Sequence, residues 1–151
     1  MAEKSLETTV QELVDREAIR DLPQRYCHYV WKQDVPAVVS LFTEDGKFDA
    51  GGAQPTAKGT EALLEAYKQG LASLDPRPFI HNHVIDLAGD QATGTCYLEL
   101  RATQDGQSVI AAGHYDDVYA KVDGEWKFRS RKFNAYYFVP LKDGWAEHKG
   151  E

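Results

Sequence analysis

The sequence is poor in cysteine and methionine and has no long apolar run. Of its 151 residues, two are cysteine, Cys27 and Cys96, and one is methionine. Two cysteines are too few for a disulfide framework or a cysteine zinc site, so we expect two reduced thiols in the core. No stretch reaches the ~20 apolar residues of a membrane span, and the polar, acidic start lacks the apolar segment of a secretory signal. We therefore expect a cytoplasmic protein without a membrane partner.

Positive charge is also scarce. The chain has 17 lysine and arginine residues against 24 aspartate and glutamate residues, a net charge of −7. No basic run interleaves with aromatic residues, which argues against a nucleic-acid partner and against an anionic membrane surface. The composition is that of a globular protein, and neither a linker nor a repeat divides residues 1–151. We expect one domain with an ordered core at residues 5–141 and a polar tail at residues 142–151.

Helical periodicity dominates the first half of the chain. In residues 6–31, apolar residues recur at steps of three and four, which is the stripe of an amphipathic helix about seven turns long. Pro23 interrupts this stripe, so we expect either a kink or two helices that meet near it. A second helix is expected after Asp34, with Phe42 in its apolar face, and a third is expected with Thr60 as its cap.

The second half of the chain is typical of an antiparallel sheet. Its runs are rich in β-branched and aromatic residues, and glycine-centred turns separate them. An earlier strand is expected near residues 47–50. The long predicted strands are residues 79–87, 92–103, 109–121 and 125–138. Three helices and such a curved sheet make an α+β fold, and a sheet wrapped around a kinked helix forms a cone whose mouth is a natural ligand pocket.

Seven segments of the sequence form a pattern by their order and spacing. They are Asp15 to Leu22, Arg25-Tyr26, Asp34 through Leu41 to Gly46, Lys58 to Ala62, Gly89 to Ala92, Tyr119 to Phe128 and Tyr137 to Leu141. This pattern covers nearly the whole chain and resembles the SnoaL-like branch of the nuclear transport factor 2-like superfamily. Scytalone dehydratase, hexachlorocyclohexane dehydrochlorinase and the bile acid dehydratases have a similar pattern.

The resemblance implies a cone-shaped antiparallel or mixed sheet around three helices, also described as a cystatin-like α+β barrel. It implies no cofactor, and a homodimer or homotrimer formed through the sheet. It also implies proton-abstraction chemistry, either β-elimination (a lyase or dehydratase) or isomerisation. The substrate would be a small apolar compound, aromatic or steroid-like, bound in the cone pocket.

The catalytic Asp–His pair of these enzymes has no counterpart at the matching positions. The aspartate position falls on Trp31 and the histidine position on or beside Pro78. An indole can only donate a hydrogen bond, so it cannot orient and stabilise a protonated imidazole as a carboxylate does. A direct transfer of the family's mechanism is therefore not possible.

Two nearby histidines are candidate replacements for the missing base. His81 and His83 lie in a strand where strict alternation places them on one face with Phe79 and Ile85. The family register instead turns Pro78, Ile80 and Asn82 toward the pocket. A β-bulge near Asn82 would reconcile the two registers and bring a histidine inward. The alternative is that both histidines lie on the outer face of the sheet or at a subunit contact.

Further candidates come from the helix and from the last two strands. Tyr26 would lie in the pocket and polarise a ligand oxygen, or it is a core aromatic. The register of the similar family implies that Tyr115 and Asp117 point inward, where Asp117 would support a histidine base or pair with an arginine. Of Arg129 and Arg131 we favour Arg131, which could also hold a ligand's negative charge.

The same register predicts a pocket wall that is also apolar core. Its members are Trp31, Phe48, Leu71, Asn82, Cys96, Leu98, Leu100, Tyr115, Arg131, Phe133 and Ala135. The His-x-His pair could bind a metal ion, but no third ligand is marked by spacing. We therefore expect neither a metal site nor a cofactor.

Three functions are compatible with these residues. The first is a lyase or isomerase with His81 or His83 as base, supported by Asp117. The second is a non-catalytic binding module that kept the cone and lost the Asp–His pair, since Trp31 adds apolar wall where a charge is expected. The third is a structural role like that of the small subunit of ring-hydroxylating dioxygenases, which has this fold.

Overall fold

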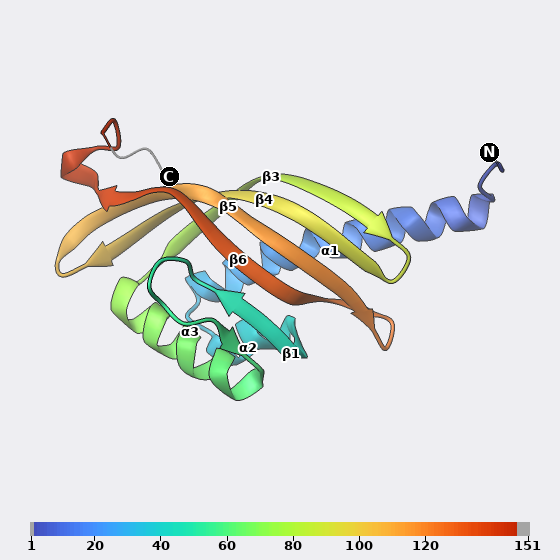
Figure 1. The fold of residues 1–151 in the computed structure, drawn as a ribbon, viewed down its shortest axis with the longest axis horizontal. Coiled ribbons are helices and arrows are strands. Elements are labelled where there is room, and N and C mark those ends of the chain that lie inside the picture. Colours follow the sequence, from blue (N-terminus) through green and yellow to red (C-terminus); the bar gives the residue numbers. More distant parts are fainter. Residues whose placement is uncertain (1, 148–151) are drawn as a thin grey trace.

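The computed structural model describes residues 2–147 and confirms the predicted order of elements (Figure 1). Of the expected polar tail, residues 148–151 lie outside this range, and Trp145 stacks on Tyr137 with 5.2 Å between ring centroids. The elements are α1 (Leu6–Trp31), α2 (Val35–Ser40), β1 (Phe42–Asp49), β2 (Ala57–Lys58), α3 (Thr60–Leu74), β3 (Arg77–Ala88), β4 (Gln91–Gln104), β5 (Gln107–Val122), β6 (Glu125–Pro140) and a short 3₁₀ helix, Leu141–Asp143.

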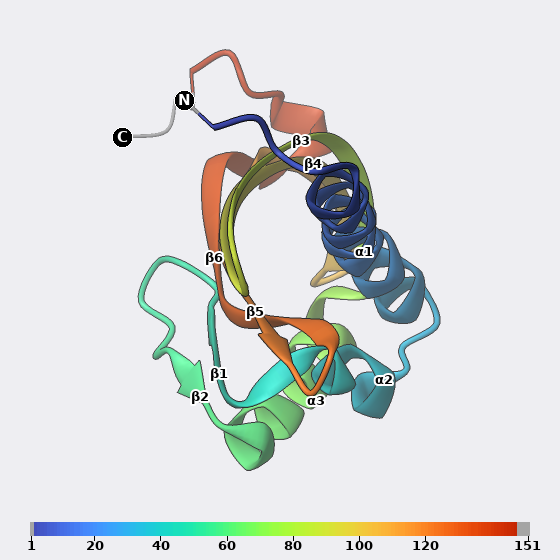
Figure 2. The ribbon, with the colours of Figure 1, turned by 90° about the vertical axis from the view of Figure 1, so that its right-hand side faces the viewer.

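One curved six-stranded sheet forms the body of the fold. Its strand order is β2-β1-β6-β5-β4-β3, in which β1 runs parallel to β6 and the other neighbours are antiparallel. Seen end-on, the sheet curls around the interior while α1, α2 and α3 close the remaining side (Figure 2). The mixed cone-shaped α+β fold is therefore confirmed, with a sheet that stays open at its β2 and β3 edges.

The turns between the long strands explain why these residues form hairpins. Asp105 and Gly106 have φ of 51° and 74°, and Asp123 and Gly124 have φ of 51° and 80°. Two successive residues of positive φ match the right-handed twist of the flanking strands, and Asp-Gly tolerates that conformation best. These turns confirm the predicted antiparallel pairing.

Two side chains of α1 bond to the open edge of β3. Arg16 Nη1 donates to the carbonyl oxygen of Ile85 at 2.9 Å, and Trp31 Nε1 donates to that of Pro78 at 2.7 Å. An edge strand presents unpaired carbonyl groups that invite another strand. The helix therefore covers this edge at both ends, and Trp31 has a structural role.

Several local predictions need correction. Of the two alternatives at Pro23, the one with two separate helices is wrong, because the first helix runs from Leu6 to Trp31 as one element. Phe42 opens β1 because the second helix ends at Ser40. Thr60 is the first residue of α3 and Gly59, with φ of 88°, precedes it without a side-chain cap.

The apolar residues of α1 lie on two opposite faces rather than on one stripe. Val10, Leu13 and Val14 are exposed, whereas Ile19 and Leu22 are buried. With 3.6 residues per turn, the first group lies on the far side of the helix from the second. Both groups have helical spacing, so periodicity alone cannot reveal that the first turns extend beyond the core (Figure 1).

Candidate functional site

A bulge in β3 separates the two candidate histidines. Ile80 pairs with Leu98 and His83 pairs with Cys96, so β3 has one residue more than β4 over this stretch. The extra residue shifts the alternation by one. His83 therefore turns inward, while His81 stays on the outer face with its Nε2 2.8 Å from Glu99 Oε2. Asn82, expected at the pocket wall, is exposed.

A second register shift, in β6, directs an arginine into the core. Phe128 pairs with Tyr119 and Ser130 pairs with Val118, so β6 has an extra residue here. Arg131 consequently points inward like Phe128, and only 1% of its surface is exposed. Without this shift, strict alternation would turn Ser130 rather than Arg131 toward the interior.

Arg131 makes a bidentate pair with Asp117, which is 2% exposed. Its Nε donates to Asp117 Oδ1 at 2.8 Å and its Nη2 donates to Oδ2 at 2.9 Å. Asp117 raises the pKa of Arg131 well above its usual range, although burial opposes this. Asp117 was expected either to support a histidine base or to pair with an arginine, and the structure shows that it pairs with Arg131.

Aromatic rings enclose the Arg131 guanidinium. Its carbon lies 3.7 Å from the ring centroid of Tyr115, 4.3 Å from that of Phe128 and 4.4 Å from that of Tyr26. Rings stabilise a cation through their negative faces. Arg131 Nη1 has no hydrogen-bond partner among the described residues, and a buried N–H group in that state is rare.

Tyr119 connects His83 to this buried pair. The phenol oxygen lies 2.8 Å from His83 Nε2, and the hydroxyl donates to Asp117 Oδ2 at 2.9 Å. The chain His83–Tyr119–Asp117–Arg131 therefore spans β3, β5 and β6. Tyr119 was not among the predicted site residues, because nothing local in its strand distinguishes it from a core aromatic.

The electrostatics keep His83 neutral near pH 7. Burial lowers the pKa of His83 from its ordinary 6.5. The charge of Asp117 raises this pKa, whereas Arg131 and Arg20 lower it. A neutral imidazole is the form that can accept a proton. Burial raises the pKa of Tyr119 as well, and so does the neighbouring Asp117, so its phenol stays protonated.

The other predicted site residues fall into two groups. Tyr26 is buried and its hydroxyl lies 2.9 Å from that of Tyr67. Trp31, by contrast, is 42% exposed at the end of α1. Six of the remaining pocket-wall candidates pack in or against the core and are Phe48, Leu71, Cys96, Leu98, Tyr115 and Phe133. Leu100 is partly buried, and Ala135 is exposed.

Cys27 and Cys96 are free, buried thiols, as expected. Burial raises the pKa of Cys27 to about 12 and that of Cys96 to about 11. Thiols in this state are poor nucleophiles. They are therefore not candidate nucleophiles.

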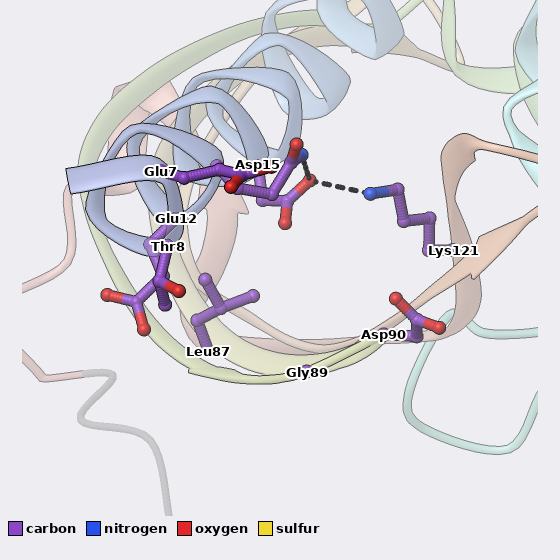
Figure 3. Close-up of a pocket in the computed structure, with 9 residues that line it drawn as sticks. Glu7, Thr8, Glu12, Asp15, Leu87, Gly89, Asp90 and Lys121 are labelled. Carbon is purple, nitrogen blue, oxygen red and sulfur yellow. Dashed lines mark hydrogen bonds and ion pairs between the residues drawn. The ribbon is translucent and has the colours of Figure 1, made fainter. Parts of the chain in front are cut away.

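A groove lies away from these residues, beside the first turns of α1 (Figure 3). It has a volume of about 420 Å³, and α1 and the β3–β4 turn form two of its walls. Asp15 and Lys121 meet across it at 3.1 Å. Trp126 Nε1 also donates to Asp15 at 2.9 Å. Of the charged residues that line it, all but Lys121 are acidic, and neither His83 nor Arg131 reaches it.

Residues 2–147 lack two features that would indicate other kinds of site. Among these residues, no three or more histidine, cysteine, aspartate or glutamate side chains gather as metal ligands would. None of the helices in the same range combines the length and apolarity that crossing a membrane requires.

Known proteins with a similar sequence share this architecture. Gamma-hexachlorocyclohexane dehydrochlorinase of Sphingobium indicum is 27% identical over 142 residues, which cover 87% of each chain. A crystal structure of LinA, a dehydrochlorinase of this kind, superposes with a TM-score of 0.82 at 26% identity and covers 88% of this chain and 93% of that one. A Mycobacterium tuberculosis protein of unknown function is 26% identical, with a TM-score of 0.75 over 84% of this chain and 75% of its own.

A family model also matches most of the chain. The model of the SnoaL-like domain aligns with residues 11–132. That range includes every residue of the His83–Tyr119–Asp117–Arg131 chain. The protein belongs to the SnoaL-like domain family.

Proposed function

We propose that this protein is a cofactor-free lyase or isomerase that removes a proton from a small apolar ring compound, with His83 as the base. One observation carries the proposal: the β3 bulge turns a neutral imidazole inward and connects it to a buried carboxylate–guanidinium pair. The dehydrochlorinases among its relatives support this class of reaction. The proposed chemistry keeps the family's fold and moves the base from the position of Pro78 to that of His83.

The groups suit a β-elimination. His83 accepts the proton from carbon, the electron pair of the broken C–H bond becomes the new double bond, and the leaving group departs with its bonding pair. The unpartnered Arg131 Nη1 would donate a hydrogen bond to the group that gains negative charge. Tyr26 and Tyr115 would contact the ring of the substrate. In an isomerisation, the same imidazole returns the proton to another carbon.

The test is turnover by the purified protein and two matched variants. Suitable probes are γ-hexachlorocyclohexane, followed by chloride release, and a cyclic β-hydroxy ketone, followed by loss of water. We expect His83→Gln to lower turnover by about 10²-fold or more, because a general base contributes about that much. His81→Gln, two residues away on the outer face, should retain wild-type turnover. Full activity of His83→Gln would contradict the proposal.

The pH dependence gives an independent readout. Since burial lowers the pKa of His83, the imidazole is neutral above the ordinary histidine value of about 6.5 and somewhat below it. Turnover should therefore be constant near neutrality and fall only as the pH drops through the lowered pKa. An acid limb with its midpoint above about 7 would exclude His83 as the base.

A binding module is the second candidate. Trp31 and Pro78 occupy the positions of the catalytic Asp and His in similar enzymes, and Trp31 Nε1 donates a hydrogen bond to the Pro78 carbonyl oxygen. A structural contact at these two positions favours a binding module. Calorimetry with the same two probes separates the candidates. Saturable binding without release of chloride or water would favour the binding module over the lyase.

A further inference from the structure

Tyr119 has a single hydroxyl hydrogen to donate, and this determines which imidazole nitrogen of His83 is protonated. The Tyr119 oxygen has two polar neighbours, His83 Nε2 at 2.8 Å and Asp117 Oδ2 at 2.9 Å. A phenol has one hydrogen to donate, and an ionised carboxylate can only accept. The phenol hydrogen must therefore point to Asp117, and the contact with His83 requires Nε2 to be the donor.

The bidentate contact with Arg131 makes both oxygens of Asp117 acceptors and so keeps the phenol in this direction. Arg131 donates to both of these oxygens, and both side chains have no solvent exposure. The hydroxyl of Tyr119 consequently has no alternative acceptor of comparable strength.

Gly94 on β4 provides the room that Tyr119 occupies. A Cβ atom at this position would lie 2.9 Å from Tyr119 Cε2, 3.0 Å from its hydroxyl oxygen and 2.9 Å from the carbonyl oxygen of Val84. The φ of Gly94 is not positive, so space and not backbone conformation requires glycine here. A glycine inside a strand often marks such a close approach.

We propose that Tyr119 is a positioning residue that holds neutral His83 as the Nε2–H tautomer, so that Nδ1 is the atom that accepts the substrate proton. This inference rests on the proposed function for its catalytic consequence, but the tautomer itself is a property of the free protein. It also explains how Asp117 acts on His83 without touching it: the carboxylate orients the phenol, and the phenol orients the imidazole.

The proton balance needs no transfer along the chain. When Nδ1 takes the proton from carbon, Nε2 keeps its own hydrogen and Tyr119 keeps its phenol hydrogen on Asp117. The charged groups that face the imidazolium are Asp117 from β5, Arg131 from β6 and Arg20 from α1. Of these three, only Asp117 favours the charged form, and Tyr119 connects the imidazole to it.

The direct test is nitrogen NMR of the full-length protein labelled at histidine, with the His83 signals assigned from their loss in His83→Gln. At pH 7.5 we expect a protonated Nε2 and an unprotonated Nδ1. The opposite tautomer would mean that Tyr119 donates to His83, and it would overturn the proposal.

Two variants then test whether Tyr119 sets the tautomer. Tyr119→Phe removes the acceptor of the Nε2–H group, and Gly94→Ala displaces the ring while the hydroxyl remains. Both should convert the single Nε2–H signal pattern into a mixture of tautomers. Tyr97→Phe, on the outer face, is the matched control and should leave the pattern unchanged. A folded Tyr119→Phe protein that retains the pure Nε2–H tautomer would also overturn the proposal.

Turnover separates this proposal from the proposed function. With γ-hexachlorocyclohexane as probe, Tyr119→Phe should lower kcat about tenfold or more, because part of the imidazole then has its proton on Nδ1, while KM changes little. Wild-type protein that shows the Nε2–H tautomer and turns over neither this probe nor the β-hydroxy ketone would refute the lyase and leave the tautomer assignment standing.

Discussion

Two buried carboxylates, Asp117 in the interior and Asp15 beside a groove, show how differently one fold treats the same charge. Asp117 and Arg131 have side chains with no solvent exposure. Asp15 and Lys121 are 9% and 23% exposed and border an open groove (Figure 3). Three aromatic rings pack on the guanidinium of the interior pair, whereas the pair beside the groove can still be hydrated.

The difference teaches that burial, and not the presence of an ion pair, decides what a charge costs and what it can do. Removing one partner of a fully buried pair leaves an uncompensated charge in a medium of low polarity. Removing one partner at a hydrated edge costs little, since water replaces it. The interior is therefore the region where a charge can orient other groups with precision, at the expense of tolerance to mutation.

The largest expected effect is at the interior pair. Arg131→Met leaves Asp117 buried without its two donors and should lower the free energy of unfolding by about 3–5 kcal/mol, measured by urea denaturation. The double variant Asp117→Leu with Arg131→Met removes both charges and should recover a large part of this loss. A single variant that loses less than about 1 kcal/mol would show that water reaches Asp117.

The matching change at the edge should be much smaller. Lys121→Met leaves Asp15 with its hydrogen bonds from Trp126 and Gln11, so we expect a loss of about 1 kcal/mol or less in the same experiment. Lys132→Met, at an exposed position of β6, is the control for losing one positive charge. A loss as large as that of Arg131→Met would mean that the two regions do not differ.

The stability of the protein in acid should depend on the ionisation of Asp15. Burial opposes ionisation of Asp15, but hydrogen bonds from Trp126, Lys121 and Gln11 outweigh it and lower its pKa from 3.8. A lowered carboxyl pKa stabilises the folded state above the ordinary value, and this contribution is lost as the pH falls through the lowered pKa. Urea denaturation between pH 2 and 6, roughly the range in which carboxyl groups titrate, should show this loss in wild type and a weaker one in Asp15→Asn. Equal curves would contradict the role of Asp15.

The smallest effect is expected on the outer face of α1. Leu13 is 62% exposed, so Leu13→Ala should change the free energy of unfolding by no more than about 0.5 kcal/mol. The same substitution at the buried Leu22 should cost about 2–5 kcal/mol and serves as the internal comparison. A large loss at Leu13 would indicate that this face is covered in solution.

Much of the architecture follows from local chemistry and could be predicted. Asp-Gly pairs favour the turns that join the long strands, and β-branched and aromatic runs favour those strands. The pairing of Asp117 with Arg131 was one of two predicted alternatives, because an inward carboxylate needs a cation. The candidate bulge near Asn82 was also predictable, since two registers of the same strand conflicted.

The rest of the site depends on contacts between strands that are distant in sequence. Strict alternation cannot show the extra residue in β6 that turns Arg131 inward, because a bulge exists only relative to its partner strand. Tyr119 was missed for the same reason: its two partners, His83 and Asp117, are joined through it only when β3 and β5 curve toward each other.

Sequence alone thus determined the element types, the hairpins and the family, all of which rest on local propensity and spacing. Tertiary structure decided which histidine faces the interior and which face of α1 is covered. Both groups of apolar residues in that helix have helical spacing, but they lie on opposite faces, and only the face toward the sheet is buried. Periodicity indicates which residues share one face of a helix, whereas their burial depends on what packs against that face.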